Sequence, residues 1–259
     1  MKKRVFLLMV LVSFILASCV RAPVKHDQVL DTIGPLAAVP DIVLTVPEVL
    51  RGDVMHEVAP GETLWRISKM YDVGMEDIIG ANNLEDPTKL EKGDRLHIPN
   101  AAPFRSVIPL YPSQKWQYII IHHSATEVGN ALSFDYQHIK NRNWKCIGYD
   151  FVIDNGTAGK EDGQIEVSPR WVNQEDGAHC KADNMNYRGI GICLVGNFNE
   201  EVVTTSQMKS LVFLVKTLKE YYRVSNSRIL GHGQVKGANT DCPGTNFPWR
   251  EFREGLITR

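Results

Sequence analysis

Residues 118–122 read Tyr-Ile-Ile-Ile-His, and residues 229–232 read Ile-Leu-Gly-His, so two short apolar runs each end in a histidine. Cys242 follows ten positions after His232. Apolar runs of this length are typical of buried strands, and open α/β sheets present ligand-binding groups at the C-terminal ends of their strands. We therefore expect His122, His232 and Cys242 to converge on one site.

Two imidazoles and one thiolate form a three-ligand set for zinc, with a fourth position left for water. This arrangement is typical of catalytic zinc, which lowers the pKa of its water to about 7 and polarises a carbonyl group. The spacing alone leaves two alternatives open. Cys242 and His232 can instead form a nucleophilic pair, which would give His122 no role. Eight histidines also allow accidental pairs.

The composition is that of a globular protein without a dominant charge. The 259 residues carry a formal net charge of −1. That balance provides no basic field of the kind that attracts nucleic acid, so we expect no nucleic-acid partner. The length suits one large domain or two smaller ones, and we expect a monomer.

The N-terminus has the features of an export signal. Lys2-Lys3-Arg4 precedes an apolar run at 5–16 that is too short for a dependable membrane span, and Ala17-Ser18-Cys19 closes it. A Cys after small residues resembles a bacterial lipobox, although a chance Cys after an ordinary signal peptide is the alternative. We expect a signal peptide over 1–18, lipidation of Cys19 and a lipid-anchored location in the cell envelope. Val20 in place of an acidic residue favours the outer membrane or periplasmic side over the inner membrane.

Five cysteines are present, and three remain once Cys19 is assigned to lipid and Cys242 to metal. An odd remainder in an exported protein allows one disulfide at most. Cys193 lies within an apolar run and is expected to be a buried thiol. Cys146 and Cys180 are the candidate pair, and the sequence leaves open whether they are bonded.

The segment before the zinc motif divides into a tether and a compact unit. Residues 19–53 carry scattered prolines and no helical period, which predicts an extended tether. Residues 54–99 contain short strands near both ends and two short helices between them, the first capped by Thr63. The predicted order is β-α-α-β.

Three motifs in this unit resemble the LysM domain. They are Val58-x-Pro-Gly-Glu-Thr-Leu-Trp-x-Ile67, Ile79-x-x-Asn-Asn-Leu84 and Leu90-x-x-Gly-x-x-Leu-x-Ile-Pro99. The resemblance implies binding of glycans that contain N-acetylglucosamine, usually peptidoglycan, between the first strand–helix loop and the second helix–strand loop. Many of these residues also suit turns or a core, and packing is an equally good interpretation of Leu64 and Trp65. The implied glycan-binding residues are Gly61, Glu62, Thr63, Leu64, Asn83 and Leu84.

After a connector at 100–113, residues 114–259 read as one α/β domain. The run at 190–195 is almost wholly apolar, which predicts a central strand covered on both faces. Thr204 and Gln207 form a capping box for an amphipathic helix. The patterns predict further strands at 116–121, 149–153, 164–167 and 228–230, and a short helix at 132–140.

This domain contains five sequence motifs that follow one another along the chain. They are Ile119-Ile-Ile-His-His-Ser-Ala-Thr126, Trp144-x-x-Ile-Gly-Tyr-Asp-Phe151, Gly177-Ala-His179, Ile190-Gly-Ile-x-Leu-Val-Gly-Asn-Phe198 and Gly231-His-x7-Thr-x-Cys-Pro-Gly244. Together they resemble the zinc N-acetylmuramoyl-L-alanine amidases, a family that includes phage-type lysozymes and peptidoglycan recognition proteins. The resemblance implies a mixed central sheet flanked by helices. It also implies hydrolysis of the amide between N-acetylmuramic acid and L-alanine of the stem peptide.

The resemblance assigns roles to individual residues. It places the Zn²⁺ ligands at His122, His232 and Cys242. It places at Tyr149 the tyrosine that orients the zinc water or the tetrahedral intermediate, and at Thr240 a hydrogen-bond donor. Phage-type members have Lys at the latter position, so the neutral Thr240 supplies less charge stabilisation.

Three further residues match positions that line the substrate groove in this family. His179 is expected to contact substrate, with a structural histidine bonded to backbone as the alternative. Arg170 and Asn186 also match groove positions, although a surface charge and a turn residue explain them nearly as well. His123 alternates with His122 along a strand and should point to the other face.

Three functions are consistent with parts of this pattern. Non-catalytic members of the family typically lack the Cys ligand, so Cys242 and Tyr149 favour an enzyme over a peptidoglycan-binding lipoprotein without turnover. A protein that only anchors the cell wall would explain the LysM motifs and Cys19, but it would have no need for the zinc ligands. We therefore expect a lipid-anchored peptidoglycan hydrolase whose partners are peptidoglycan and a membrane.

Overall fold

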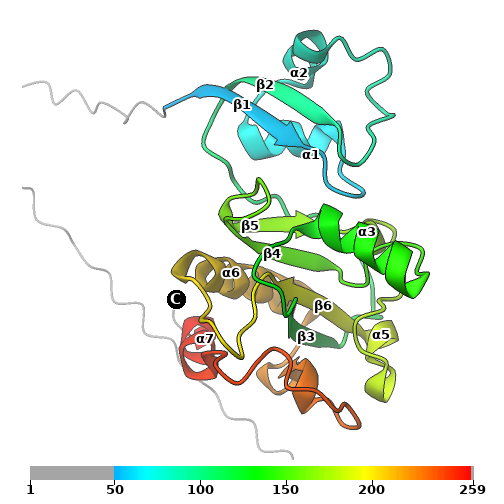
Figure 1. Cartoon of the computed structure of the whole chain (residues 1–259), viewed down its shortest axis with the longest axis vertical. Coiled ribbons are helices and arrows are strands. Elements are labelled where there is room, and N and C mark those ends of the chain that lie inside the picture. Colours follow the sequence, from blue (N-terminus) through cyan, green and yellow to red (C-terminus); the bar gives the residue numbers. More distant parts are fainter. Residues whose placement is uncertain (1–49, 258–259) are drawn as a thin grey trace, which may run out of the picture. The chain divides into compact units, whose positions relative to one another are not determined.

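The computed structural model describes residues 50–257 (Figure 1). The predicted signal peptide, Cys19 and nearly all of the tether lie outside the described residues. The described residues all belong to one compact unit. Within the described part of the chain, every helix is too short or too polar to cross a bilayer.

The N-terminal domain has the predicted β-α-α-β order. Thr63 caps the first helix by accepting a hydrogen bond from the Arg66 N–H at 3.3 Å. The two strands pair in antiparallel register, with His56 opposite Leu96. Buried Ile67, Met70, Ile78 and Ile98 are among the apolar side chains between the helices and this ribbon. The elements are β1 (Gly52–Glu57), α1 (Leu64–Tyr71), α2 (Met75–Asn82) and β2 (Arg95–Ala101).

The C-terminal domain is built on a five-stranded mixed sheet, as predicted. Its strand order is β5-β4-β6-β3-β7, and only the β4–β5 pair is antiparallel. The strand at 189–194 is central and fully buried, which confirms the prediction made from its apolar run. The strands are β3 (Tyr118–His123), β4 (Phe151–Asn155), β5 (Asp162–Val167), β6 (Gly189–Leu194) and β7 (Ile229–Gly231).

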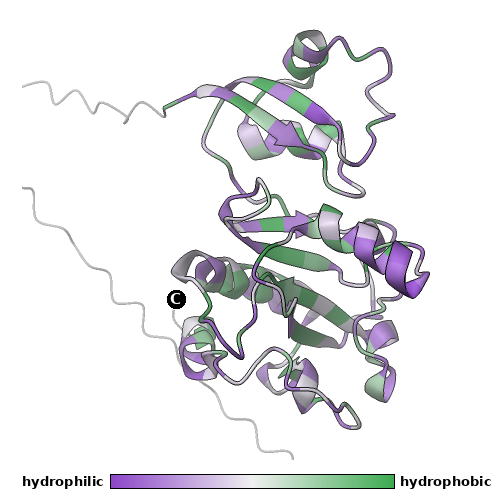
Figure 2. Cartoon of the chain, viewed as in Figure 1, coloured by the Kyte–Doolittle hydropathy of each residue, from purple (hydrophilic) through white to green (hydrophobic). Residues whose placement is uncertain are grey.

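Helices cover both faces of this sheet. Leu211, Leu214 and Leu218 of α6 pack into the larger core cluster on one face, and Phe134 of α3 packs on the other. The predicted Thr204 capping box is present at the start of α6. Figure 2 shows the apolar colour concentrated on the strands. The helices are α3 (Ala131–Arg142), α4 (Pro169–Val172), α5 (Met185–Arg188), α6 (Thr205–Tyr222) and α7 (Trp249–Ile257), with 3-10 turns η1 (Ala182–Asn184), η2 (Asn226–Arg228) and η3 (His232–Gln234).

The four cysteines of the described chain are free thiols and all are buried. Cys193 is the buried thiol that its apolar run predicted. The candidate bridge between Cys146 and Cys180 is not formed. Packed cores rather than disulfides hold the described fold, and the Cys242 thiol is free.

Candidate metal and active site

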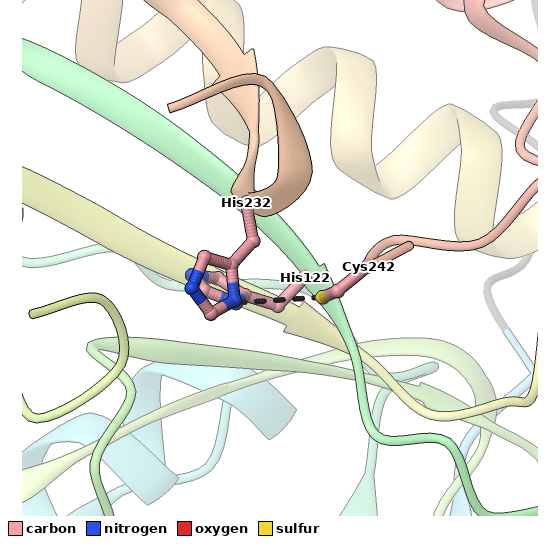
Figure 3. A group of neighbouring side chains, drawn as sticks. All are labelled: His122, His232 and Cys242. Atoms are coloured by element: carbon pink, nitrogen blue, oxygen red, sulfur yellow. Dashed lines mark hydrogen bonds between the residues drawn. The ribbon is translucent and has the colours of Figure 1, made fainter. Parts of the chain in front are cut away.

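His122 and His232 meet because their strands are neighbours. β3 and β7 run parallel, with Ile121 paired to Gly231, so the residue after each pair emerges at the same end of the sheet. Cys242 reaches this point from the loop after η3. Its Sγ lies 3.6 Å from His122 Nδ1 (Figure 3). The three ligand atoms lie within 4.8 Å of one another, as predicted.

This geometry fits a tetrahedral zinc ion. Zinc binds imidazole nitrogen at about 2.0–2.1 Å and thiolate sulfur at about 2.3 Å, so two such ligands in a tetrahedron lie about 3.6 Å apart. The separation of His122 Nδ1 and Cys242 Sγ matches that value. Nitrogen and sulfur donors together also suit zinc better than magnesium or calcium, which prefer oxygen.

Burial sets the protonation states of the three side chains. It lowers the pKa of His122 well below its ordinary value and also lowers that of His232, so both imidazoles are neutral and able to bind metal. Burial raises the pKa of the Cys242 thiol to about 12. A thiol in this environment ionises near neutral pH only beside a cation, so the pocket is suited to a thiolate that a metal stabilises.

His179 lies behind His122 and has the backbone contact expected of the structural alternative, while its contact with substrate stays a prediction. Its Nδ1 is 3.0 Å from His122 Nε2, and its Nε2 is 3.1 Å from the Gly189 carbonyl oxygen. With both nitrogens engaged and 7% of the residue exposed, it has no free nitrogen to offer a substrate. If His179 donates to the carbonyl, its Nδ1 accepts from His122 Nε2–H, which leaves His122 Nδ1 for the metal. Such a partner fixes the orientation of a ligand histidine.

A glycine makes room for this ring. A Cβ at Gly191 of β6 would lie 2.5 Å from His179 Cγ, closer than van der Waals contact allows. The central strand therefore passes directly against the imidazole. Packing and the Gly189 carbonyl together hold His179 in one orientation.

His123 points to the opposite face of β3, as the alternation predicted. Its Nδ1 accepts a hydrogen bond from the Phe198 N–H at 3.1 Å. Its own backbone N–H lies 3.4 Å from Cys242 Sγ and donates to the sulfur. His123 thus supports the site through its backbone while its side chain belongs to the fold.

Tyr149 lies beside the metal set. Its ring centroid is 5.4 Å from that of His122. Burial, followed by the neighbouring Cys193 and Cys242, raises the pKa of Tyr149 well above its ordinary value. The phenol therefore stays protonated at neutral pH and is available as a hydrogen-bond donor.

Thr240 lies in the exposed loop that carries the sulfur ligand. Its Oγ1 accepts a hydrogen bond from the Cys242 N–H at 3.2 Å. The hydroxyl hydrogen remains free to point elsewhere, so the expected donor role is compatible with this contact. Thr240 thus also shapes the backbone that presents Cys242.

Arg170 and Asn186 bond to backbone around the site. The Arg170 Nε–H donates to the Ile147 carbonyl oxygen at 2.6 Å. Asn186 Oδ1 accepts from the Cys180 N–H at 2.7 Å. Both side chains therefore hold loops in place, and their contact with substrate stays a prediction.

A pocket of about 340 Å³ opens beside Tyr149. Its polar lining comes largely from one face of α3. The sequence predicted a helix here but not its place beside the site. The polar pair Gln137 and Asn141, spaced i, i+4 on one helix face, could have indicated that place. The pocket is lined by Ser124, Phe134, Gln137, His138, Asn141, Arg142 and Tyr149.

The N-terminal domain carries a second groove, of about 400 Å³, between α1 and α2. Trp65 and Met75 line it and are 53% and 40% exposed, so they offer the largest apolar surface there. An exposed indole is a suitable surface for stacking a sugar ring. The groove is lined by Glu62, Thr63, Leu64, Trp65, Met75, Glu76, Ile79, Pro87, Thr88 and Leu90.

Four of the six predicted glycan-binding residues also have roles in the fold, and their contact with glycan stays a prediction. Glu62 and Leu64 line the groove, although Glu62 is buried in ion pairs and Leu64 is 4% exposed in the core. Asn83 caps α2 in the left-handed region, and Leu84 packs on the core, so neither lines the groove. Turn and cap chemistry explains their place in the motif.

Gly61 and Thr63 lie in the turn that leads into α1. Gly61 has a φ of 77°, a conformation that glycine adopts without strain. Thr63 caps α1 and also lines the groove. Their contact with glycan stays a prediction.

Comparison with known proteins agrees with this geometry. The family model described as N-acetylmuramoyl-L-alanine amidase matches residues 112–245, just over half of the chain. The chain belongs to the N-acetylmuramoyl-L-alanine amidase family. The model for the LysM domain matches residues 56–99. The amidase domain therefore carries the metal set, and the LysM domain carries the groove with Trp65.

Relatives of this amidase domain come from animals and phages. Peptidoglycan-recognition protein SC2 of Drosophila melanogaster is 32% identical over 148 residues, which cover 52% of this chain and 72% of that protein. The endolysin of Escherichia phage T7 is also 32% identical over 148 residues, covering 54% and 88%. Among solved structures, the endolysin amidase LysCS from Clostridium intestinale is 34% identical over 56% of this chain and 86% of that chain, with a TM-score of 0.47.

Proposed function

We propose that this protein hydrolyses the amide between N-acetylmuramic acid and L-alanine in peptidoglycan, with Zn²⁺ held by His122, His232 and Cys242. The observation that carries the proposal is the convergence of these three ligand atoms within 4.8 Å at the C-terminal ends of β3 and β7. Bound there, zinc supplies the Lewis acidity that activates water and polarises an amide carbonyl.

The chain's own residues complete the chemistry around that group. The Tyr149 phenol, kept protonated by burial, donates a hydrogen bond to the oxygen that gains negative charge. Thr240 supplies a second, neutral donor from the ligand loop. His179 holds the His122 ring in place, so the nitrogen that binds metal stays directed at the site.

A binding protein without turnover is the competing function. Some relatives are named for peptidoglycan recognition rather than hydrolysis. Recognition alone requires a groove but does not require a sulfur ligand beside two histidines. The complete set, with a protonated phenol 5.4 Å from His122 between ring centroids, supports the hydrolase.

We further propose that the LysM domain binds the glycan and that a lipid on Cys19 anchors the chain in the cell envelope, with the outer membrane or periplasmic side favoured. Tethering raises the effective concentration of a weak glycan-binding domain near the wall. Replacement of Cys19 by Ala, with radiolabelled fatty acid as the tracer, tests the anchor. The variant should lose label and leave the membrane fraction.

The amidase proposal is tested by Cys242→Ser. Wild-type protein should release stem peptides from purified peptidoglycan, and a chelator should stop this release. Cys242→Ser should lose zinc and release, yet still bind chitin oligosaccharides through residues 56–99. Release by the Ser variant at the wild-type rate would show that the metal set is not the catalyst.

A further inference from the structure

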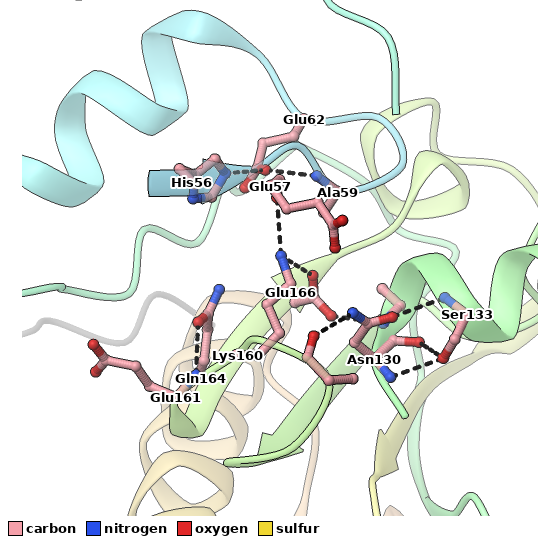
Figure 4. A network of polar contacts seen from close by, with 12 residues as sticks. His56, Glu57, Ala59, Glu62, Asn130, Ser133, Lys160, Glu161, Gln164 and Glu166 are labelled. Atoms are coloured by element: carbon pink, nitrogen blue, oxygen red, sulfur yellow. Dashed lines mark hydrogen bonds and ion pairs between the residues drawn. The ribbon is translucent and has the colours of Figure 1, made fainter. Parts of the chain in front are cut away.

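The LysM and amidase domains contact each other through buried charged side chains. The Arg66 guanidinium of α1 donates to the Ile165 carbonyl oxygen of β5 at 3.2 Å. The Lys160 ammonium donates to the Glu57 carbonyl oxygen of β1 at 2.9 Å and lies 3.2 Å from the Glu166 carboxylate (Figure 4). Charged groups are rarely buried unless they are paired. Separation of the domains would remove partners from both cations, so the docked arrangement is favoured.

A second contact links the LysM domain to α3. The turn before β2 carries Lys92, whose Nζ lies 2.5 Å from Asp135 Oδ2 and 4.9 Å from the centre of the Tyr136 ring. The side chain of Lys92 is 36% exposed, whereas that of Asp135 is 1% exposed. A carboxylate buried in the amidase domain therefore receives its cation from the LysM domain.

Asp135 also holds the backbone that leads to Tyr149. Its Oδ1 accepts a hydrogen bond from the Ile147 N–H at 2.7 Å. One turn further along α3, His138 Nδ1 accepts the N–H of the next residue in the segment at 3.1 Å. A single buried carboxylate thus joins Lys92 to the segment that ends at Tyr149.

We propose that the docked LysM domain positions the Tyr149 segment through Lys92 and Asp135, separately from any glycan that it binds. The inference rests on the function proposed above, because Tyr149 has a catalytic role only in a hydrolase. Lys92 and Asp135 are positioning residues, since they act through the backbone of Ile147. The two roles of the LysM domain are separable because Lys92 does not line the groove that contains Trp65.

The size of the effect follows from the contacts that remain. Without the ion pair between Lys92 and Asp135, the LysM domain no longer holds the side chain that accepts from the Ile147 N–H, so the segment is less firmly placed. A displacement of about 1 Å in a catalytic group can lower the rate by on the order of 100-fold. The His138 and Arg170 contacts still hold the segment, so we expect a decrease of about tenfold in kcat.

The test compares Lys92→Met with Lys89→Met in the full chain. Lys89 is a lysine of the same domain whose side chain is 80% exposed and pairs with Asp86 of that domain at 2.9 Å. The substrate is a soluble disaccharide that carries one stem peptide. Lys92→Met should lower kcat about tenfold with KM little changed, whereas Lys89→Met should match wild type.

Hydrogen exchange provides a readout that does not depend on activity. The amides of residues 145–149 should exchange faster in Lys92→Met than in wild type or Lys89→Met. Asp135→Asn keeps an oxygen that can accept from Ile147 but removes the charge, so it should have the same effect as Lys92→Met. The double variant should be no worse than either single variant, and Lys92→Arg should restore most of the activity.

Two results would overturn the inference. The first is a Lys92→Met variant with the kcat and the hydrogen exchange of wild type. The second is a double variant in which the effects of Lys92→Met and Asp135→Asn on kcat multiply, because the two residues would then act independently. If Lys92→Met does not fold, the comparison of Asp135→Asn and Lys92→Arg with wild type decides the question. A wild-type protein that cleaves nothing would contradict the proposed function, while the exchange data would still show whether the LysM domain holds the segment.

Discussion

Glu62→Gln tests the buried charges of the LysM domain. Glu62 Oε2 lies 2.7 Å from His56 Nε2, and Oε1 lies 2.9 Å from the Arg66 guanidinium. Burial alone would raise the pKa of Glu62, but the hydrogen bond from His56 and the charges of both partners outweigh it and lower the pKa to about 2. A decrease from the ordinary 4.5 to about 2 corresponds to roughly 3 kcal/mol of folding stability at neutral pH.

The pH dependence of this stabilisation has a defined sign. Because the pKa is lower in the folded state, the stabilisation is complete above pH 4.5 and is lost as the pH falls toward 2. Urea denaturation of wild type and Glu62→Gln should therefore show a difference of about 3 kcal/mol at pH 7 that narrows below pH 4.5. Exposed Glu85→Gln is the matched control and should show little difference at any pH. Equal stability of wild type and Glu62→Gln at pH 7, or a difference that stays constant down to pH 3, would refute the reasoning.

Three other variants separate the parts of the site. His179→Ala should lower zinc affinity by 10- to 100-fold in a chelator competition assay, because it removes the partner that orients His122; an unchanged zinc affinity would mean that packing alone holds the ring. Tyr149→Phe should keep its zinc and lower kcat by 10²- to 10³-fold, the usual cost of one donor to a developing oxyanion; a kcat within twofold of wild type would remove Tyr149 from the chemistry. Trp65→Ala should weaken binding of chitin oligosaccharides about tenfold, as expected for loss of a stacking surface; unchanged binding in calorimetry would place the glycan elsewhere.

The sheet and the metal set could be predicted from the sequence because both follow from local patterns. Apolar runs of strand length predicted β3 and β6, and a histidine directly after a strand emerges at a known end of the sheet. Since parallel neighbours share that end, His122 and His232 were expected to meet. The expectation of a mixed sheet came from the resemblance, and the strand order was not predicted, because periodicity does not show which strands pair.

The contacts that could not be predicted concern residues whose roles depend on distant neighbours. His179 is in a family motif, but its place behind His122 depends on Gly189 and Gly191 of β6. Glu62 lies in the LysM motif, yet its partners His56 and Arg66 become visible only when the strand and helix are packed together. Burial and cross-element contacts decided these roles, and neither can be read from spacing.

Other features were missed because nothing in the local pattern indicated them. α7 (Trp249–Ile257) was not predicted. The Lys92–Asp135 ion pair joins residues 43 positions apart. Lysine in a turn is usually a solvated charge, so nothing in the local pattern indicated that Lys92 lies against a buried carboxylate.

Digestion of peptidoglycan in water labelled with heavy oxygen tests the central claim most directly. Hydrolysis of the proposed amide places one heavy oxygen in the new lactyl carboxylate of N-acetylmuramic acid and leaves an unlabelled stem peptide that begins with the free amine of L-alanine. We predict that mass spectrometry will find this pair of products, and that a chelator or Cys242→Ser will abolish both. Label in a new peptide carboxylate, or cleavage that persists in the chelated protein, would contradict a zinc amidase.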